Sequence, residues 1–190
     1  MLQTDNSAMA TGCASVTSQP DGPPVVHTII CKMKASDLDA CLMVWWQACM
    51  VGHSFLPKSV KLRQWRRLRD GQLNVANTWL ALDDRQVAGF ASVSDPSHLA
   101  GLFVAPAHQR KGIGRQLVAH IAAVAGALEV DVYQANQEAR AFYREQGFQT
   151  VDRRFPDLDG ERYALLRMRQ KPELDLGANG GSCLRWVGHV

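Results

Sequence analysis

The chain contains no apolar run that approaches the roughly 20 residues needed to span a bilayer. Its first residues also lack the basic segment followed by an apolar segment that is typical of a secretory signal. We therefore expect neither insertion into a membrane nor export.

Cysteine is also sparse and unpatterned. The five cysteines are an odd number, with no C-x-x-C pair and no histidine spacing that suits zinc: Cys13, Cys31, Cys41, Cys49 and Cys183. We therefore predict no metal site and no disulfide framework. Thiols that stay reduced are typical of a cytoplasmic protein, which is the location we expect.

The excess of charge is small. Lys and Arg number 21 against 18 Asp and Glu, a net charge of +3, which is too little to indicate nucleic-acid binding. Hydrophobic residues make up 46% and charged residues 21% of the chain, as in an ordinary soluble globular domain. The basic run over 58–69 is expected to be a helix with a solvated face, so we expect no nucleic-acid partner.

The composition changes at both ends of the chain. Residues 1–24 are rich in Ser, Thr, Gly and Pro, and residues 171–190 contain Pro172 and four glycines. Such segments bury too little apolar surface to offset the entropy of ordering them. We predict a flexible leader over 1–24, one domain over 25–170 and a flexible tail over 171–190. Met9 is a second possible start, so the sequence does not decide whether the leader belongs to the native protein.

Between the ends, the hydrophobic pattern switches repeatedly between the strand and helix periods. Apolar and β-branched runs predict strands over 25–34, 78–82, 87–93, 99–104, 130–133, 148–153 and 163–168. Caps and amphipathic runs predict helices from Ser36 or Asp37 through Cys49, and over 58–69, 112–127 and 137–146. The fold class is therefore mixed α/β, with an antiparallel front and a strand–helix–strand crossover behind it.

A glycine-containing turn joins the strand at 99–104 to the helix at 112–127. The free N–H groups and the dipole of a first helical turn favour an anion, and Gly112 and Gly114 let phosphates approach the backbone closely. Arg110 and Lys111 add positive charge there. The segment lacks the third glycine of a dinucleotide-binding fingerprint, and no Gly-Lys-Ser/Thr occurs, so NAD and ATP are poor candidates.

Two longer patterns surround this turn. L-x-x-L-F-V-x-P-x-x-Q-R-K-G-I-G-R-Q-L, from Leu99 to Leu117, resembles the acetyl-CoA motif of the GNAT superfamily of N-acetyltransferases. N-x-x-A-x-x-F-Y-x-x-x-G-F, from Asn136 to Phe148, matches a second motif of that superfamily. The resemblance covers about 28–168 and is closest to the small bacterial acetyltransferases. It implies a mixed, mostly antiparallel sheet flanked by helices, in which the fourth and fifth strands splay apart to form a wedge.

The resemblance also implies how acetyl-CoA is held as cosubstrate. The main chain of Phe103 and Val104 would bond the pantetheine amides, as an added strand does. Asn136 would hold the pantetheine arm, and Tyr143 would give a proton to the departing thiolate, a role that a phenol protonated at neutral pH can fill. The pyrophosphate would lie on the turn formed by Gln109, Arg110, Lys111, Gly112, Ile113, Gly114 and Arg115.

The amine side is less well defined. His98 stands where many relatives carry a glutamate, and we predict that it accepts the proton of the amine, directly or through water. His53 is a candidate substrate contact, and the acids at 157, 159 and 161 are candidates for holding a cationic amine. We predict direct acetyl transfer to a primary amine of a small molecule or protein, by a monomer or homodimer. The alternative is a non-catalytic acyl-CoA-binding module that recognises a partner through 58–69.

Overall fold

The structure is a computed structural model, and it describes residues 28–95, 97–157 and 160–171. The predicted leader, 1–24, and all of the predicted tail beyond Lys171 lie outside the described residues.

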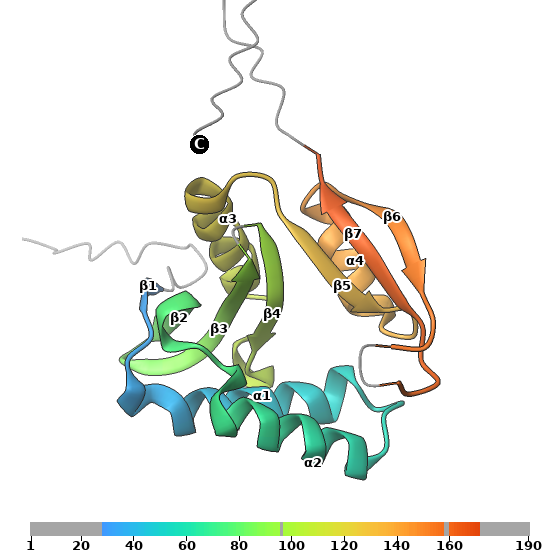
Figure 1. Cartoon of the computed structure of the whole chain (residues 1–190). Coiled ribbons are helices and arrows are strands. Elements are labelled where there is room, and N and C mark those ends of the chain that lie inside the picture. Colours follow the sequence, from blue (N-terminus) through green and yellow to red (C-terminus); the bar gives the residue numbers. More distant parts are fainter. Residues whose placement is uncertain (1–27, 96, 158–159, 172–190) are drawn as a thin grey trace, which may run out of the picture.

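Seven strands form one sheet, in the order β1-β2-β3-β4-β5-β7-β6 (Figure 1). Every neighbouring pair is antiparallel except β4 and β5, which run parallel. The predicted mixed α/β class with a mostly antiparallel sheet is confirmed. The strands are β1 (Ile29–Lys32), β2 (Thr78–Asp83), β3 (Gln86–Asp95), β4 (His98–Val104), β5 (Glu129–Tyr133), β6 (Phe148–Arg154) and β7 (Leu165–Gln170).

Helices pack on both faces of this sheet. α3 (Ile113–Ala125) and α4 (Gln137–Glu145) lie behind it in Figure 1, whereas α1 (Leu38–Gly52) and α2 (Lys58–Arg67) cross its lower end. α3 buries one stripe, as its 3.6-residue period predicts: Ile113, Leu117, Val118 and Ile121. Two hydrophobic clusters result, one that includes α3 and a second that includes α1.

Several predicted boundaries are wrong by a few residues, and three of them have a local cause. β1 ends at Lys32 instead of residue 34, because the Lys34 N–H bonds the Asp37 carboxylate and not a neighbouring strand. α2 ends at Arg67, and a wider helical turn follows over 68–72, where Gly71 takes a φ of +117°. β7 begins at Leu165, two residues later than predicted, because Tyr163 N–H bonds locally to the Glu161 carbonyl.

β4 and β5 form the predicted wedge. They pair only where both strands begin, His98 with Glu129 and Leu99 with Val130. β4 runs on to Val104 and β5 to Tyr133 without further pairing between them. The two strands therefore leave main-chain groups available along the gap, in the way an edge strand does.

Candidate active site

A cleft of about 890 Å³ opens at this wedge, and its walls come from both faces of the sheet. Gly112, Gly114 and Tyr143 line it on the α3 and α4 side, and His53 and Asp131 line it on the other side. Most of the site residues predicted from the sequence line the cleft, but Lys111 and Glu161 do not. Lys111 is exposed, and Asp159 lies outside the described residues.

The backbone before α3 curves into a concave turn. Arg110 has a φ of +63° and Gly112 one of +80°, both in the left-handed region. A left-handed conformation is costly for a residue with a side chain, and such strain clusters at functional sites. The first α3 hydrogen bond runs from Gln116 N–H to the Gly112 carbonyl, so the N–H groups of residues 113–115 have no partner within the helix. This is the donor set that an anion needs.

Gly114 closes the same turn from the helix side. A Cβ built on it would lie 3.3 Å from the Phe142 ring, closer than side chains normally approach. A larger residue here would therefore require the Phe142 ring of α4 to shift by a few tenths of an ångström. The residues and backbone present fit a pyrophosphate held by main-chain donors, with Arg110 and Arg115 beside it in the cleft wall.

The edge of β4 that faces the gap is defined by the ladder to β3. Ala105 N–H bonds the Ala88 carbonyl, and hydrogen-bonded pairs alternate along an antiparallel ladder. The main-chain groups of Phe103 thus pair with Phe90 of β3, which does not leave them free to bond pantetheine as predicted. The main-chain groups of Leu102 and Val104 point toward the gap beside β5 instead. The Gln109 side chain donates to the Val104 carbonyl over 3.0 Å and so fixes the open end of the strand.

Asn136 begins α4 as its N-cap. Its Oδ1 accepts from Ala139 N–H over 3.0 Å, as the cap preference of asparagine predicts. Its Nδ2 lies on the side of Gly52, since a Cβ on that glycine would be 3.6 Å away. The same side chain therefore caps the helix with its oxygen and presents donors to the cleft with its nitrogen.

Tyr143 lies on the buried face of α4, with only 5% of its surface exposed. Its ring packs edge-on against Phe142 and Phe148, with centroids 5.1 Å and 5.2 Å away. Burial raises the pKa of the phenol well above its ordinary value of about 10. The hydroxyl is therefore protonated throughout the neutral range and acts as a donor.

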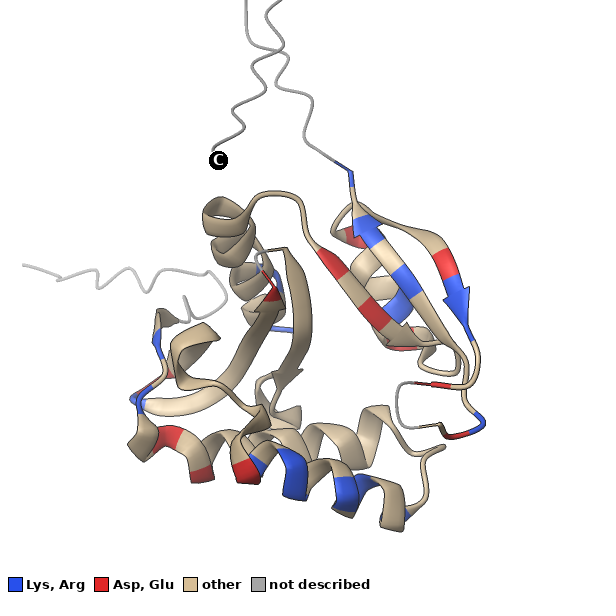
Figure 2. Cartoon of the chain, in the orientation of Figure 1, with Lys and Arg blue, Asp and Glu red and all other residues tan. Residues whose placement is uncertain are grey.

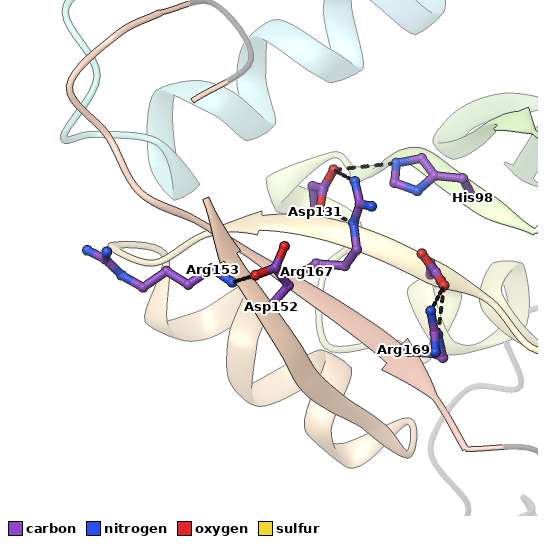
Figure 3. A network of polar contacts seen from close by, with 7 residues as sticks. His98, Asp131, Asp152, Arg153, Arg167 and Arg169 are labelled. Atoms are coloured by element: carbon purple, nitrogen blue, oxygen red, sulfur yellow. Dashed lines mark hydrogen bonds and ion pairs between the residues drawn. The ribbon is translucent and has the colours of Figure 1, made fainter. Parts of the chain in front are cut away.

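His98 lies at the closed end of the wedge, facing a carboxylate (Figure 3). Its Nε2 is 3.8 Å from Oδ2 of Asp131. Arg167 of β7 binds that carboxylate with two parallel hydrogen bonds of 3.0 Å, Nε to Oδ1 and a terminal nitrogen to Oδ2. The hydrogen bond to Asp131 is the first cause of a raised Arg167 pKa.

Aromatic rings cluster at the end of β5, and of these His53 and Tyr133 line the cleft. Tyr133 lies edge-on to His53 and to Phe55, each with centroids 5.4 Å apart, and Tyr163 is 6.2 Å from Tyr133. The Tyr133 hydroxyl donates to the Asp157 carboxylate over 3.1 Å. Asp157, which the sequence offered only as one of three turn acids, is 6% exposed and lines the cleft.

His53 ends α1 and is not a base at neutral pH. Burial, reinforced by the charge of Lys61, lowers its pKa to about 4. Its Nδ1 lies 3.3 Å from the Cys49 sulfur, and burial raises the pKa of that thiol to about 12. His53 is therefore a neutral wall of the cleft, and Cys49 is a protonated thiol rather than a nucleophile.

Sequence reasoning missed Asp131 and Tyr133 as cleft residues. The signal was present: in β5 Val130 and Val132 are buried, so the residues between and after them face the other side of the sheet. The partners of Asp131 lie on β4 and β7, which local pattern alone does not bring together.

The basic run of α2 does not form a continuous charged surface. Lys61 is buried and donates to the His53 carbonyl. Arg63 pairs with Glu161, and Arg69 pairs with Asp70. Figure 2 shows basic residues on this helix and on β6 and β7, with acidic residues among them. Two arginines of the run are therefore paired with acids, and Lys61 is buried instead of solvated.

Within the described ranges, no helix is long and apolar enough to cross a membrane. The same part of the chain holds no group of three or more His, Cys, Asp or Glu side chains placed to bind a metal ion. Cys31, Cys41 and Cys49 are free thiols.

A family model described as "Acetyltransferase (GNAT) domain" matches residues 47–160, which include the wedge, the turn before α3 and Tyr143. The chain belongs to the GNAT acetyltransferase family. It is therefore an N-acetyltransferase, and the alternative of a non-catalytic module is not favoured. The resemblance predicted from the two motifs is confirmed, together with the fold that it implied.

Named relatives agree with this assignment. Peptidyl-lysine N-acetyltransferase YiaC of Escherichia coli strain K12 is 36% identical over 128 residues, 65% of this chain and 85% of that protein. The solution structure of apo YjaB from Escherichia coli has a TM-score of 0.69 at 26% identity, covering 75% of this chain and 96% of that one. The PaiA N-acetyltransferase of Thermoplasma acidophilum, solved in complex with coenzyme A, shares the fold, with a TM-score of 0.59 at 18% identity over 76% of this chain and 98% of that one.

Proposed function

We propose that this N-acetyltransferase takes its acetyl group from acetyl-CoA and transfers it to the side-chain amine of a lysine in a protein or peptide. The observation that carries the proposal is a cleft whose walls lie on both faces of the sheet. A donor can enter from the α3 and α4 side while an acceptor meets it from the α1 and α2 side. The names of relatives such as YiaC support lysine as the acceptor.

On the donor side, the backbone does most of the binding. The N–H groups at the start of α3 would hold the pyrophosphate, and Arg110 and Arg115 would neutralise it. The main chain of Leu102 and Val104 and the amide of Asn136 would bond the pantetheine arm, which adds to the edge of β4 as a strand does. The cosubstrate supplies a thioester whose carbonyl carbon lies open to an amine.

On the acceptor side, the neutral ring of His53 and the ring of Tyr133, which line the cleft, would contact the aliphatic part of a lysine. His98 would take one proton from the ammonium, which frees the lone pair that forms the new C–N bond. As the C–S bond breaks, the electron pair goes to sulfur and Tyr143 gives it a proton. The proton that leaves the new amide restores the phenol through water, so the products are an acetyl-lysine, the free thiol and one proton.

A panel of acceptors tests the proposal. Peptides that each contain one lysine are incubated with acetyl-CoA, and release of the free thiol is followed together with the mass of the peptide. Matched peptides with norleucine in place of lysine, and free amines of small molecules, are the controls. We expect thiol release and one added acetyl group only where a lysine side chain is present. Turnover of small amines with none of lysine peptides would assign a different acceptor.

We also propose that the protein acts in the cytoplasm as a monomer or homodimer. Support comes from the free thiols of Cys31, Cys41 and Cys49, which suit a reducing compartment. Light scattering on the eluting protein checks the oligomeric state, and an assembly larger than a dimer would contradict the proposal.

A further inference from the structure

The Asp131 carboxylate stands out among the ion pairs that join β5 to β7. Two such pairs lie two residues apart along the strands: Asp131 with Arg167, and Glu129 with Arg169. Both acids lie on the same face of β5, because strand residues two apart point to the same side. They differ in two respects. Asp131 lines the cleft and Glu129 does not, and Asp131 lies within 4 Å of the His98 imidazole.

Arg167, and not His98, sets the orientation of the Asp131 carboxylate. Arg167 engages both oxygens, a bidentate arrangement that fixes the plane of the carboxylate. Each carboxylate oxygen has two lone-pair sites, so Oδ2 keeps one for the imidazole after accepting from Arg167. The side chains of His98 and Asp131 are only 21% and 12% exposed, so solvent screens their interaction weakly.

We propose that Asp131 is the positioning residue of His98. A carboxylate is an acceptor only, so it favours the imidazole tautomer that carries its hydrogen on Nε2. Nδ1 is then the nitrogen with a lone pair, and it accepts the proton of the acceptor ammonium. The imidazolium that forms faces the negative charge of Asp131, which stabilises it. This inference rests on the proposed role of His98 in the reaction described above.

The distance of 3.8 Å is longer than a hydrogen bond. Contacts between catalytic groups are commonly long without substrate and shorten when the acceptor binds. Figure 3 shows the two side chains directed toward each other from neighbouring strands.

A double-mutant cycle tests the proposal with the full chain. We expect His98→Ala to lower kcat about 10²-fold and Asp131→Asn about 10-fold, each with little change in the KM of acetyl-CoA. In the His98→Ala background, Asp131→Asn should change nothing further, because its effect passes through the missing imidazole. Glu129→Gln is the matched control, which removes the neighbouring pair on the same strands and should leave kcat within about twofold.

The imidazole itself provides a second readout. The amide that Asp131→Asn introduces would direct donor hydrogens at Nε2 and so favour the tautomer with its hydrogen on Nδ1. The nitrogen NMR shifts of Nδ1 and Nε2 of His98 should therefore be interchanged in this variant relative to the wild type. An unchanged tautomer, or full additivity of the two substitutions, would overturn the positioning role. Full activity of His98→Ala would overturn the positioning role as well and would remove His98 from the mechanism. The proposed function is tested independently, by thiol release with lysine peptides.

Discussion

Replacing Tyr143 by phenylalanine removes one oxygen from the cleft and little else. The ring packs against Phe142 and Phe148, and these contacts do not involve the hydroxyl. Because the two rings have nearly the same volume, the variant should fold with the stability of the wild type. The effect of the substitution on rate is therefore an effect on chemistry.

The magnitude follows from the proposed role. A positioned general acid contributes about 10²- to 10⁴-fold, so we expect kcat to fall at least about 10²-fold, which is about 2.7 kcal/mol of transition-state stabilisation. Burial raises the pKa of the Tyr143 phenol, so the wild-type rate should not decline up to about pH 9 through loss of this proton. The KM of acetyl-CoA should change little, because binding depends on the backbone of β4 and α3.

The assay is thiol release at saturating acetyl-CoA and lysine peptide, with thermal unfolding measured in parallel. Tyr133→Phe is the matched control, a second tyrosine of the same cleft whose hydroxyl bonds Asp157 at the acceptor end. It should raise the KM of the peptide and leave kcat within a few-fold. If Tyr143→Phe retains more than about a tenth of the wild-type kcat, the phenol is not the acid and the reasoning fails.

Three further substitutions test the cleft and its surroundings. The Cβ added by Gly112→Ala meets no close neighbour, but the residue must keep a φ of +80°, so the free energy of unfolding should fall by about 1–2 kcal/mol. The KM of acetyl-CoA should also rise. An unchanged KM, measured by titrating acetyl-CoA, would contradict pyrophosphate binding by the backbone of this turn. Gly89→Ala would place a Cβ 2.8 Å from the Phe103 carbonyl oxygen, so chemical denaturation should show a loss of about 1–3 kcal/mol. The pKa of His53 is about 4 in the folded protein, below the ordinary 6.5, so as the pH falls the unfolded chain binds a proton at a higher pH than the folded protein does. Stability should fall by about 3 kcal/mol as pH drops through that window, and His53→Gln should abolish this component of the pH dependence.

Local sequence predicted the donor half of the site better than the acceptor half, for a physical reason. The turn before α3 joins adjacent elements, so glycine positions and a helix start are enough to place its N–H groups. The cap formed by Asn136 is equally local. The conformation of Arg110 was not predictable, because a left-handed arginine has no composition signature and depends on the fold around it.

The acceptor half depends on contacts between residues far apart in sequence. His98 and Asp131 meet because β4 and β5 are parallel neighbours, and Arg167 reaches them only through the register of β7. Asp157 lies in the loop after β6, and its carboxylate accepts a hydrogen bond from the Tyr133 hydroxyl. No periodicity within one segment specifies these pairings, so the sequence predicted His98 as the base without its partner Asp131.

The same strand pairing explains why an extended ligand can enter the wedge without a rearrangement of β4 and β5. Ion pairs fasten β5 to β7 at Asp131 and at Glu129, on the side away from the gap. Among the described residues, the contact of His98 with Asp131, an ion pair only when the imidazole is protonated, joins β4 to β5 at the closed end. A strand-like ligand that enters beside Val104 thus breaks no polar contact between the two strands. It meets main-chain groups already aimed into the gap, and it ends beside the pair that we assign to proton transfer.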